Sequence, residues 1–252
     1  MFFYTIAYLG EYDETTTNRR AKWYKKNRKN ILYIQYLLFA LIVSGGIFYP
    51  VLYSGSFLQI PAWQWGTAFF FALAAALYYG IPFKSLKHYN LRKTGWLKPF
   101  VIGMVWAGMV TFIPVLFFEI EHGTLYDFSI LNLWLFIKNF MFVSVLCIML
   151  DIKDYAADHN KKIKTFVVMH GLRKTIFYII IPLCITGFIA YLKFAAVMHF
   201  GAIRIFFNSI PFILLLAVAR SLKRRKHILY YLAVIDGLLL VKAICGIAGM
   251  IL

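Results

Sequence analysis

Three carboxylates follow directly on a long apolar run in this chain. The stretch "FMFVSVLCIML" continues as "DIKDYAADHNKKIKT", which begins at Asp151. If a helix continues through this stretch, Asp151, Asp154 and Asp158 fall at positions i, i+3 and i+7 and share one face of it. Three like charges on one face repel each other, so the sequence predicts that a positive charge offsets them.

Two kinds of positive charge can offset this acidic face. The first is the set of lysines in the same stretch, which would make it a solvated helix end: Lys153, Lys161, Lys162 and Lys164. The second is a divalent cation, because carboxylate oxygens suit Mg²⁺, which keeps several waters and commonly bridges to phosphates. We favour Mg²⁺, with Asp151, Asp154 and Asp158 as its ligands.

A basic segment earlier in the chain offers further positive charge. The stretch "YYGIPFKSLKHYNLRKTGWLKP" places Lys84 and Lys87 just beyond Pro82. Lysines at this position can neutralise a diphosphate held by Mg²⁺. The alternative is that they only keep the loop on the cytoplasmic side of a membrane.

The composition indicates a membrane protein. Of the 252 residues, 62% are hydrophobic and only 15% are charged, whereas a water-soluble domain carries nearer a quarter charged residues. Apolar stretches of about 20 residues, long enough to span a bilayer, recur along the chain. They lie at 31–50, 62–82, 99–118, 131–150, 174–192, 201–219 and 229–250. We therefore predict an all-α polytopic transmembrane helical bundle of about seven spans.

The charged residues are sorted between alternate loops. The chain has 27 Lys and Arg against 10 Asp and Glu, a formal net charge of +17. Most basic residues lie in 18–30, 84–98, 151–174 and 220–227, while 51–61 has none and 119–130 is acidic. Basic loops stay in the cytoplasm, so these loops and the acidic motif are predicted to face it. With no recognisable nucleic-acid module, anionic membrane lipid is the expected partner, not nucleic acid.

Two polar positions lie inside predicted spans. Asp236, in "YYLAVIDGLLLVK", is an intramembrane acid, which marks either a functional site or an internal partner. Lys138 interrupts the span that leads to Asp151, and we expect its long side chain to reach outward to the interface. The three cysteines and six histidines have no spacing typical of a zinc or redox site.

The stretch "LDIKDYAADHNKKIKTFVVMHG" resembles the second aspartate-rich motif of the UbiA-type intramembrane prenyltransferases. The positions that match are Asp151, Asp154, Asp158, Lys164, Thr165 and Gly171. The upstream stretch is similar to the family's tyrosine, proline and paired basic residues, matched here by Tyr79, Pro82, Lys84 and Lys87. The resemblance follows the helix order from about residue 18 to the end of the chain.

The resemblance implies a fold, a cofactor and an activity. The family fold is a bundle of nine transmembrane helices around a lateral cavity, of which this chain would form the third to the ninth. Family members bind an isoprenoid diphosphate through Mg²⁺ and transfer the prenyl group to an aromatic or other lipophilic acceptor. By this resemblance the three aspartates are catalytic Mg²⁺ ligands, and a bacterial cytoplasmic membrane is the expected location. The residues expected to bind the diphosphate are Lys84, Lys87, Lys153, Lys164 and Tyr79.

The N-terminal region departs from the family pattern. "MFFYTIAYLGEY" is too short to cross a bilayer, so we interpret 1–30 as a stub of the second helix with a basic cytoplasmic loop. Residues 31–252 would form the prenyltransferase-like bundle. The alternative for the stub is an interfacial anchor. The family's first aspartate-rich motif is expected here, but Glu11, Asp13 and Glu14 have a different spacing, so we expect either a truncated start or a member that has lost the motif.

Two functions therefore remain open at this stage. One is Mg²⁺-dependent prenyl transfer, and the other is a catalytically inactive isoprenoid- or lipid-binding protein of the same fold, which the absent first motif motivates. A transporter is disfavoured because no internal repeat is apparent. A CDP-alcohol phosphotransferase requires Asp-Gly-x-x-Ala-Arg, whereas Asp236 and Gly237 are followed by "LLLV". The acceptor, the isoprenoid length and the oligomeric state are not predicted.

Overall fold

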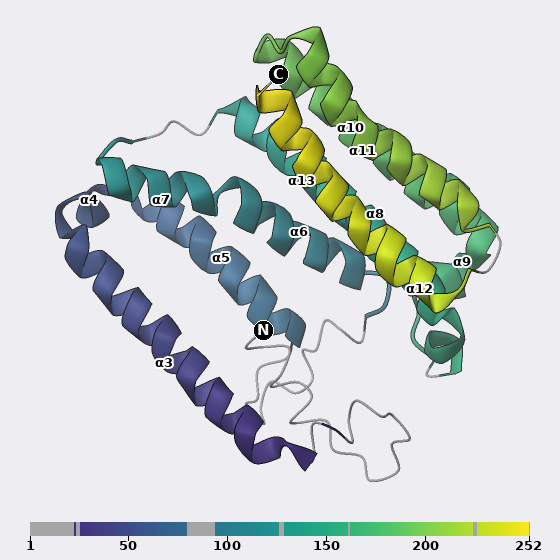
Figure 1. The fold of residues 1–252 in the computed structure, drawn as a ribbon, viewed down its shortest axis with the longest axis horizontal. Helices are drawn as coiled ribbons and strands as arrows, with labels where there is room; N and C mark the ends of the chain where they lie inside the picture. The colour runs from purple at the N-terminus through teal and green to yellow at the C-terminus, as the bar shows by residue number, and fades with distance from the viewer. Residues whose placement is uncertain are drawn as a thin grey trace. The chain divides into compact units, whose positions relative to one another are not determined.

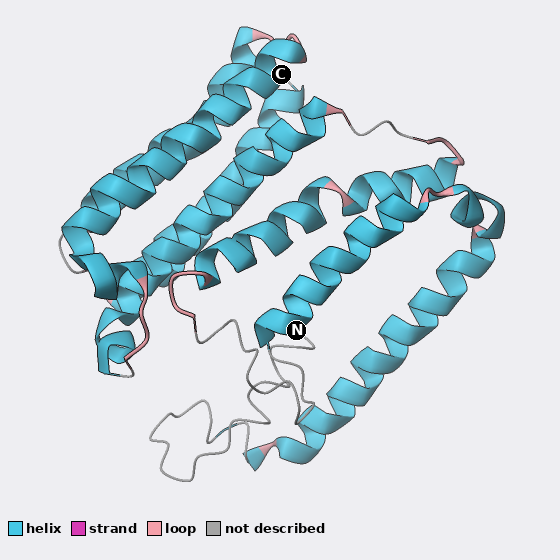
Figure 2. Ribbon diagram, turned by 180° about the vertical axis from the view of Figure 1, so that it is seen from behind, coloured by secondary structure: helices cyan, strands magenta, loops and turns pink. Residues whose placement is uncertain are grey.

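The computed structural model describes residues 23, 26–79, 94–125, 129–160, 162–223 and 226–251. Within these ranges every regular element is a helix (Figure 1 and Figure 2). The longer helices are α3 (Arg28–Leu52), α5 (Ala62–Tyr79), α6 (Lys98–Thr111), α7 (Ile113–His122), α8 (Ile130–Asn160), α10 (Ile181–Val197), α11 (Ala202–Ser221) and α13 (Asp236–Ile251). The shorter ones are α4 (Ser54–Gln59), α9 (Phe166–Thr175), α12 (Ile228–Tyr230) and the π-helical turns η3 (Ile176–Ile180) and η4 (Tyr231–Ile235).

Six helical stretches in the described part of the chain are long and apolar enough to cross a membrane. They are Arg28–Leu52, Lys98–His122, Ile130–Ala156, Phe166–Val197, Ala202–Ser221 and Ile228–Ile251. The predicted all-α polytopic fold is thereby confirmed. The seventh predicted stretch, 62–82, contains α5, an 18-residue helix that is not among these six.

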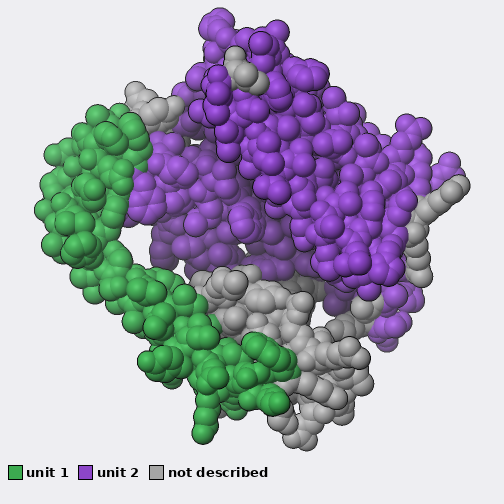
Figure 3. Space-filling view, viewed as in Figure 1, with its two compact units in different colours: residues 1–61, 118–125 green, residues 62–117, 126–252 purple. Residues whose placement is uncertain are grey.

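The chain divides into two compact units, coloured separately in Figure 3. The first comprises the described residues up to Pro61 together with Phe118–Leu125, and thus holds α3 and α4. The second comprises Ala62–Phe117 and the chain from Tyr126 onward. All the described candidate site residues belong to the second unit. Most of the N-terminal stub predicted in 1–30 lies outside the described residues.

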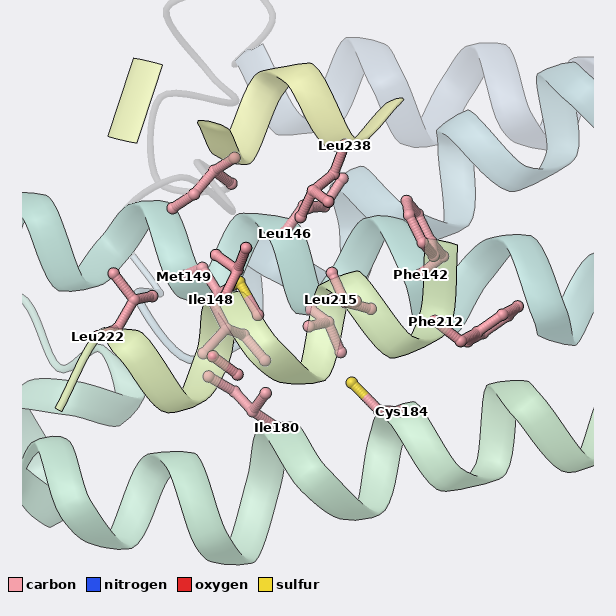
Figure 4. Close-up of a cluster of buried hydrophobic side chains, with 14 of the residues drawn as sticks. Phe142, Leu146, Ile148, Met149, Ile180, Cys184, Phe212, Leu215, Leu222 and Leu238 are labelled. Carbon is pink, nitrogen blue, oxygen red and sulfur yellow. The ribbon is translucent and has the colours of Figure 1, made fainter. Parts of the chain in front are cut away.

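The core of the second unit is built around α8. Phe142, Ile148 and Met149 on this helix are fully buried, and they pack with residues of η3, α10, α11, η4 and α13 (Figure 4). The ring of Phe142 meets that of Phe212 on α11 edge to face, with 5.8 Å between centroids. In a lipid environment this close packing, more than exclusion of water, holds neighbouring helices together.

Two glycines permit close approaches of neighbouring helices to α8. A Cβ atom at Gly103 on α6 would collide with Ser144 Oγ, and a Cβ at Gly187 on α10 would lie 3.0 Å from Met141 Cβ. Small residues at such crossings are typical of membrane helices, because they let the backbones approach. The ion pair between Lys98 and Asp151 places the start of α6 beside the acidic part of α8.

Candidate functional site

Helix α8 continues through the acidic stretch, which is the condition under which the sequence places the three carboxylates on one face. Its last residue is Asn160, so Asp151, Asp154 and Asp158 lie on one helix and share a face. Beyond it, Lys162 has a positive φ of 55°. Its N–H donates to the His159 carbonyl at 3.1 Å, and the next N–H, of Ile163, donates to the Asp158 carbonyl at 2.9 Å. These two bonds satisfy terminal carbonyls of the helix, as in a Schellman motif. We call this part of the second unit the aspartate end.

Asp151 is the most deeply placed of the three carboxylates. Only 3% of its side chain is exposed, and its Oδ1 accepts a hydrogen bond from Lys98 Nζ at 2.7 Å. A buried carboxylate without a partner is strongly destabilising, and the ammonium of Lys98 compensates the charge of Asp151. It joins the first residue of α6 to α8.

The local structure explains why Lys98 lies there. Pro99 lies in the first turn of α6, a position that suits proline because the first helical N–H groups have no helical acceptor. Just before, Gly95 lies so close to the backbone of Lys164 and Thr165 that a Cβ there would be 2.7 Å from the Lys164 carbonyl carbon. The start of α6 is therefore held against the segment that follows α8.

Asp154 and Asp158 have different surroundings from Asp151. Asp154 is half exposed, at 48%, and lies 3.4 Å from the ammonium of the adjacent Lys153. An ion pair between exposed neighbours stabilises little. The Oδ2 atom of Asp158 is buried. Both carboxylates lie within electrostatic range of Asp151, so the three acidic groups act on one another.

The donor chemistry of this cluster suits Mg²⁺, but the described side chains do not form a preassembled cage. Among the described residues, no group of three or more His, Cys, Asp or Glu side chains is arranged to hold a metal ion. Asp151 already accepts a hydrogen bond from the Lys98 ammonium through Oδ1. Because Mg²⁺ is commonly held by one or two carboxylates plus water and substrate phosphate, these residues are of a type that fits such an ion.

The segment after α8 carries the other matched positions. Thr165 caps α9, since its hydroxyl oxygen accepts from the Val168 N–H at 3.4 Å, and it is buried. The preceding Lys164 is exposed. Gly171 has φ of +76°, a conformation that favours glycine, and Thr175 Oγ1 donates to its carbonyl at 2.9 Å. The segment is thus fixed at both ends, with Lys164 free to reach solvent.

Several predicted residues are not brought into this site by the described structure. Lys84 and Lys87 lie outside the described residues, as does the side chain of Tyr79, the last residue of α5. Asp236 is exposed and begins α13 directly after the π-helical turn η4. π-helical turns are frequent at functional sites, but neither described ion pair involves Asp236.

Lys98 is the residue that sequence reasoning missed. It belongs to the predicted basic segment 84–98, but Lys84 and Lys87 were preferred within it. The signal in the sequence was the dipeptide Lys98–Pro99, which marks the first turn of a span and so places the lysine at the membrane boundary.

Comparison of the chain with protein-family models, with curated proteins and with solved structures gives no match.

Proposed function

We propose that this protein is an intramembrane prenyltransferase, which transfers an isoprenoid group from its diphosphate to an aromatic or other lipophilic acceptor. The supporting observation is the aspartate end: a buried Asp151 fixed by Lys98, with two more carboxylates on the same face of α8. The resemblance of this stretch to the UbiA-type motif supports the same activity. By the distribution of basic loops, this end would face the cytoplasm.

The chain's own residues would bind and orient the diphosphate. Lys98 holds Asp151 in one position, so the acidic face is rigid where it would meet the substrate. The ammonium groups of Lys153 and Lys164 would offset the negative charge that grows on the leaving diphosphate, with Lys84 and Lys87 in the same role. The apolar tail would lie among the aromatic-rich helices, in contact with lipid.

The proposed reaction exchanges one bond at the isoprenoid. The C1–O bond breaks and its electron pair goes to the diphosphate oxygen, while the nucleophilic atom of the acceptor bonds to C1 and releases a proton to water. Asp151, Asp154 and Asp158 would hold Mg²⁺, which supplies neutralisation of the diphosphate charge when it is bound. The lysines act on the same departing group, so both contributions favour breakage of the C1–O bond.

The direct test is turnover of labelled isoprenoid diphosphates by membranes that contain the protein, with Mg²⁺ or with EDTA. We expect release of inorganic diphosphate and a lipid-extractable product, both dependent on Mg²⁺. Asp154→Ala should lower turnover at least about 100-fold, because it removes a group that acts on the developing charge. The matched control is Glu121→Ala, which removes an exposed acid on α7. Turnover that is indifferent to EDTA and to Asp154→Ala would refute the proposal.

A second function is favoured by one specific observation. Lys98 already neutralises Asp151, and the described acids include no assembled metal group. Such an arrangement also suits a catalytically inactive protein that binds isoprenoids or other lipids. Saturable binding of a non-hydrolysable isoprenoid thiodiphosphate, without turnover of the natural diphosphate under any metal condition, would select this alternative.

A further inference from the structure

A pocket lies in the second unit away from the aspartate end. It has a volume of about 670 Å³, within the range of small-molecule sites. Its walls come from α6, α8, α11 and α13, with two aromatic residues from the end of α10 and the turn after it. Lys138 in its wall precedes Asp151 by 13 positions on α8, which corresponds to about 20 Å along the helix. The pocket is therefore distinct from the site of the proposed transfer reaction.

Three cationic side chains converge on this pocket, which we call the cation pocket. Lys138, Arg204 and Lys242 come from three different helices, α8, α11 and α13. The Lys242 ammonium donates to Asn139 Oδ1 at 2.8 Å, and Asn139 Nδ2 donates in turn to Thr111 Oγ1 at 3.2 Å. Lys242 is thus held in place by a polar chain that reaches α6.

The other contacts of these cations are with aromatic rings. Lys138 Nζ lies 5.3 Å from the centre of the Tyr191 ring, and Arg204 Cζ lies 3.8 Å from that of Phe200. The sequence led us to expect Lys138 to reach outward to the interface, whereas it forms part of the pocket wall. Cation–π contacts stabilise a positive charge but do not neutralise it.

No carboxylate balances these charges within the described ranges. The two ion pairs there, Lys98 with Asp151 and Lys153 with Asp154, both lie at the aspartate end. Arginine keeps its charge at physiological pH, and Lys138 lies within electrostatic range of both Arg204 and Lys242. Like charges inside a membrane-spanning bundle are costly, so the cation pocket is arranged to receive an anion.

The walls of the pocket indicate what carries this anion. Four of its apolar residues have more than half of their surface exposed: Trp106 at 58%, Val110 at 57%, Ile247 at 59% and Met250 at 73%. They lie on α6 and α13, which places exposed apolar surface on both sides of the pocket. A hydrocarbon chain suits such a rim, and an oxyanion suits the ammonium and guanidinium groups.

We infer that the cation pocket binds a membrane amphiphile with an oxyanionic headgroup, a phosphate or a carboxylate. The headgroup accepts hydrogen bonds from Lys138, Arg204 and Lys242, and the hydrocarbon chain leaves between α6 and α13. This binding site does not depend on the proposed prenyl transfer, since it needs neither Mg²⁺ nor the three aspartates.

The test uses the full-length protein in phosphatidylcholine nanodiscs with EDTA present. Dodecyl phosphate is titrated and the bound molecules are counted by native mass spectrometry. We expect one saturable site, and no competition from dodecyl maltoside, which has the same chain and a neutral headgroup. Equal binding of the neutral amphiphile would overturn the proposal. If inorganic phosphate at equal concentration displaces dodecyl phosphate, the proposal of an amphiphilic ligand is overturned and the site binds a free anion.

Variants separate the cation pocket from general attraction to a basic protein. Lys242→Gln and Arg204→Gln should each weaken dodecyl phosphate binding at least about tenfold, because each removes a charge-assisted hydrogen bond. Lys193→Gln, which removes an exposed lysine of α10 outside the pocket, should leave the affinity within about twofold of the parent. An equally small change in dodecyl phosphate affinity in all three variants would overturn the proposed binding site. Asp154→Asn should bind as the parent does, even if prenyl transfer fails.

Discussion

The two polar regions of α8 handle charge in opposite ways. At the aspartate end a buried carboxylate meets a lysine of the next helix at 2.7 Å, so charge is balanced inside the protein. In the cation pocket, about 20 Å away along α8, the described neighbours of Lys138 are two like charges and an aromatic ring beside an open volume. At the aspartate end the opposite charges of Lys98 and Asp151 stabilise the folded state, whereas in the cation pocket the like charges destabilise it.

This difference has a consequence for how each region responds to substitution. Removing one partner of a balanced buried pair leaves the other charge uncompensated, and the folded state loses stability. Removing one of several like charges relieves repulsion and leaves nothing newly unpaired except a hydrogen-bond acceptor. The comparison therefore predicts a large loss of stability at the aspartate end and a small change in the cation pocket.

Lys98→Met should cause the largest effect. It leaves Asp151 buried without its ammonium partner, and we expect a loss of about 2–3 kcal/mol in the free energy of unfolding. This value lies below that for a fully buried pair, because 29% of the Lys98 side chain is exposed. The measurement is denaturant unfolding of the reconstituted protein.

The double variant Lys98→Met/Asp151→Asn is the control for this loss. Because it removes both charges, it should recover most of the lost stability, and the double-mutant cycle then reports the pair itself. If Lys98→Met alone unfolds like the parent, the ion pair does not hold α6 to α8.

Gly95→Ala should have the next largest effect, through sterics alone. The added Cβ would lie 2.7 Å from backbone atoms of Lys164, and backbone cannot move aside as a flexible side chain can. We expect a loss of about 1–2 kcal/mol in unfolding free energy, as for overpacking elsewhere. Gly66→Ala on α5 is the matched control, because no atom lies within 4 Å of its added Cβ. Equal stability of the two variants would mean that the start of α6 is not held against Lys164.

The fold was largely predictable because its signals are local. An apolar run of about 20 residues forms a helix in lipid whatever its neighbours are. The sequence placed Asp151, Asp154 and Asp158 on one face only on the condition that the helix continues beyond the apolar run, and α8 does extend to Asn160.

The partners of these residues were not predictable, because they come from distant positions. Lys98 and Asp151 are 53 positions apart, and Lys242 and Asn139 are 103 apart. Only the packing of the helices decides which lysine meets which acceptor. From the sequence one can read the type of each polar residue and its position along a membrane span. The structure adds which of these residues pair with an opposite charge.

Lys242→Met tests the other side of the comparison. It removes the donor to Asn139 Oδ1, but it also removes a charge that Lys138 repels. These effects oppose each other, so the unfolding free energy without added amphiphile should change by less than about 1 kcal/mol. The measurement is the same denaturant titration. A loss as large as that of Lys98→Met would show that this ammonium is already balanced within the protein, and the need for an anionic ligand would disappear.

Asp154→Asn should have the smallest effect on stability and thereby separate two roles among the three aspartates. Its carboxylate is half exposed and lies 3.4 Å from the ammonium of the adjacent Lys153, so the unfolding free energy should stay within about 0.5 kcal/mol of the parent. A carboxylate that contributes so little to folding, next to one that is buried and paired, is available for a ligand. A loss of more than about 1 kcal/mol would instead make Asp154 a structural residue. Because Asp154→Asn keeps nearly the same shape, a folded variant that no longer turns over an isoprenoid diphosphate would locate the loss in the charge itself.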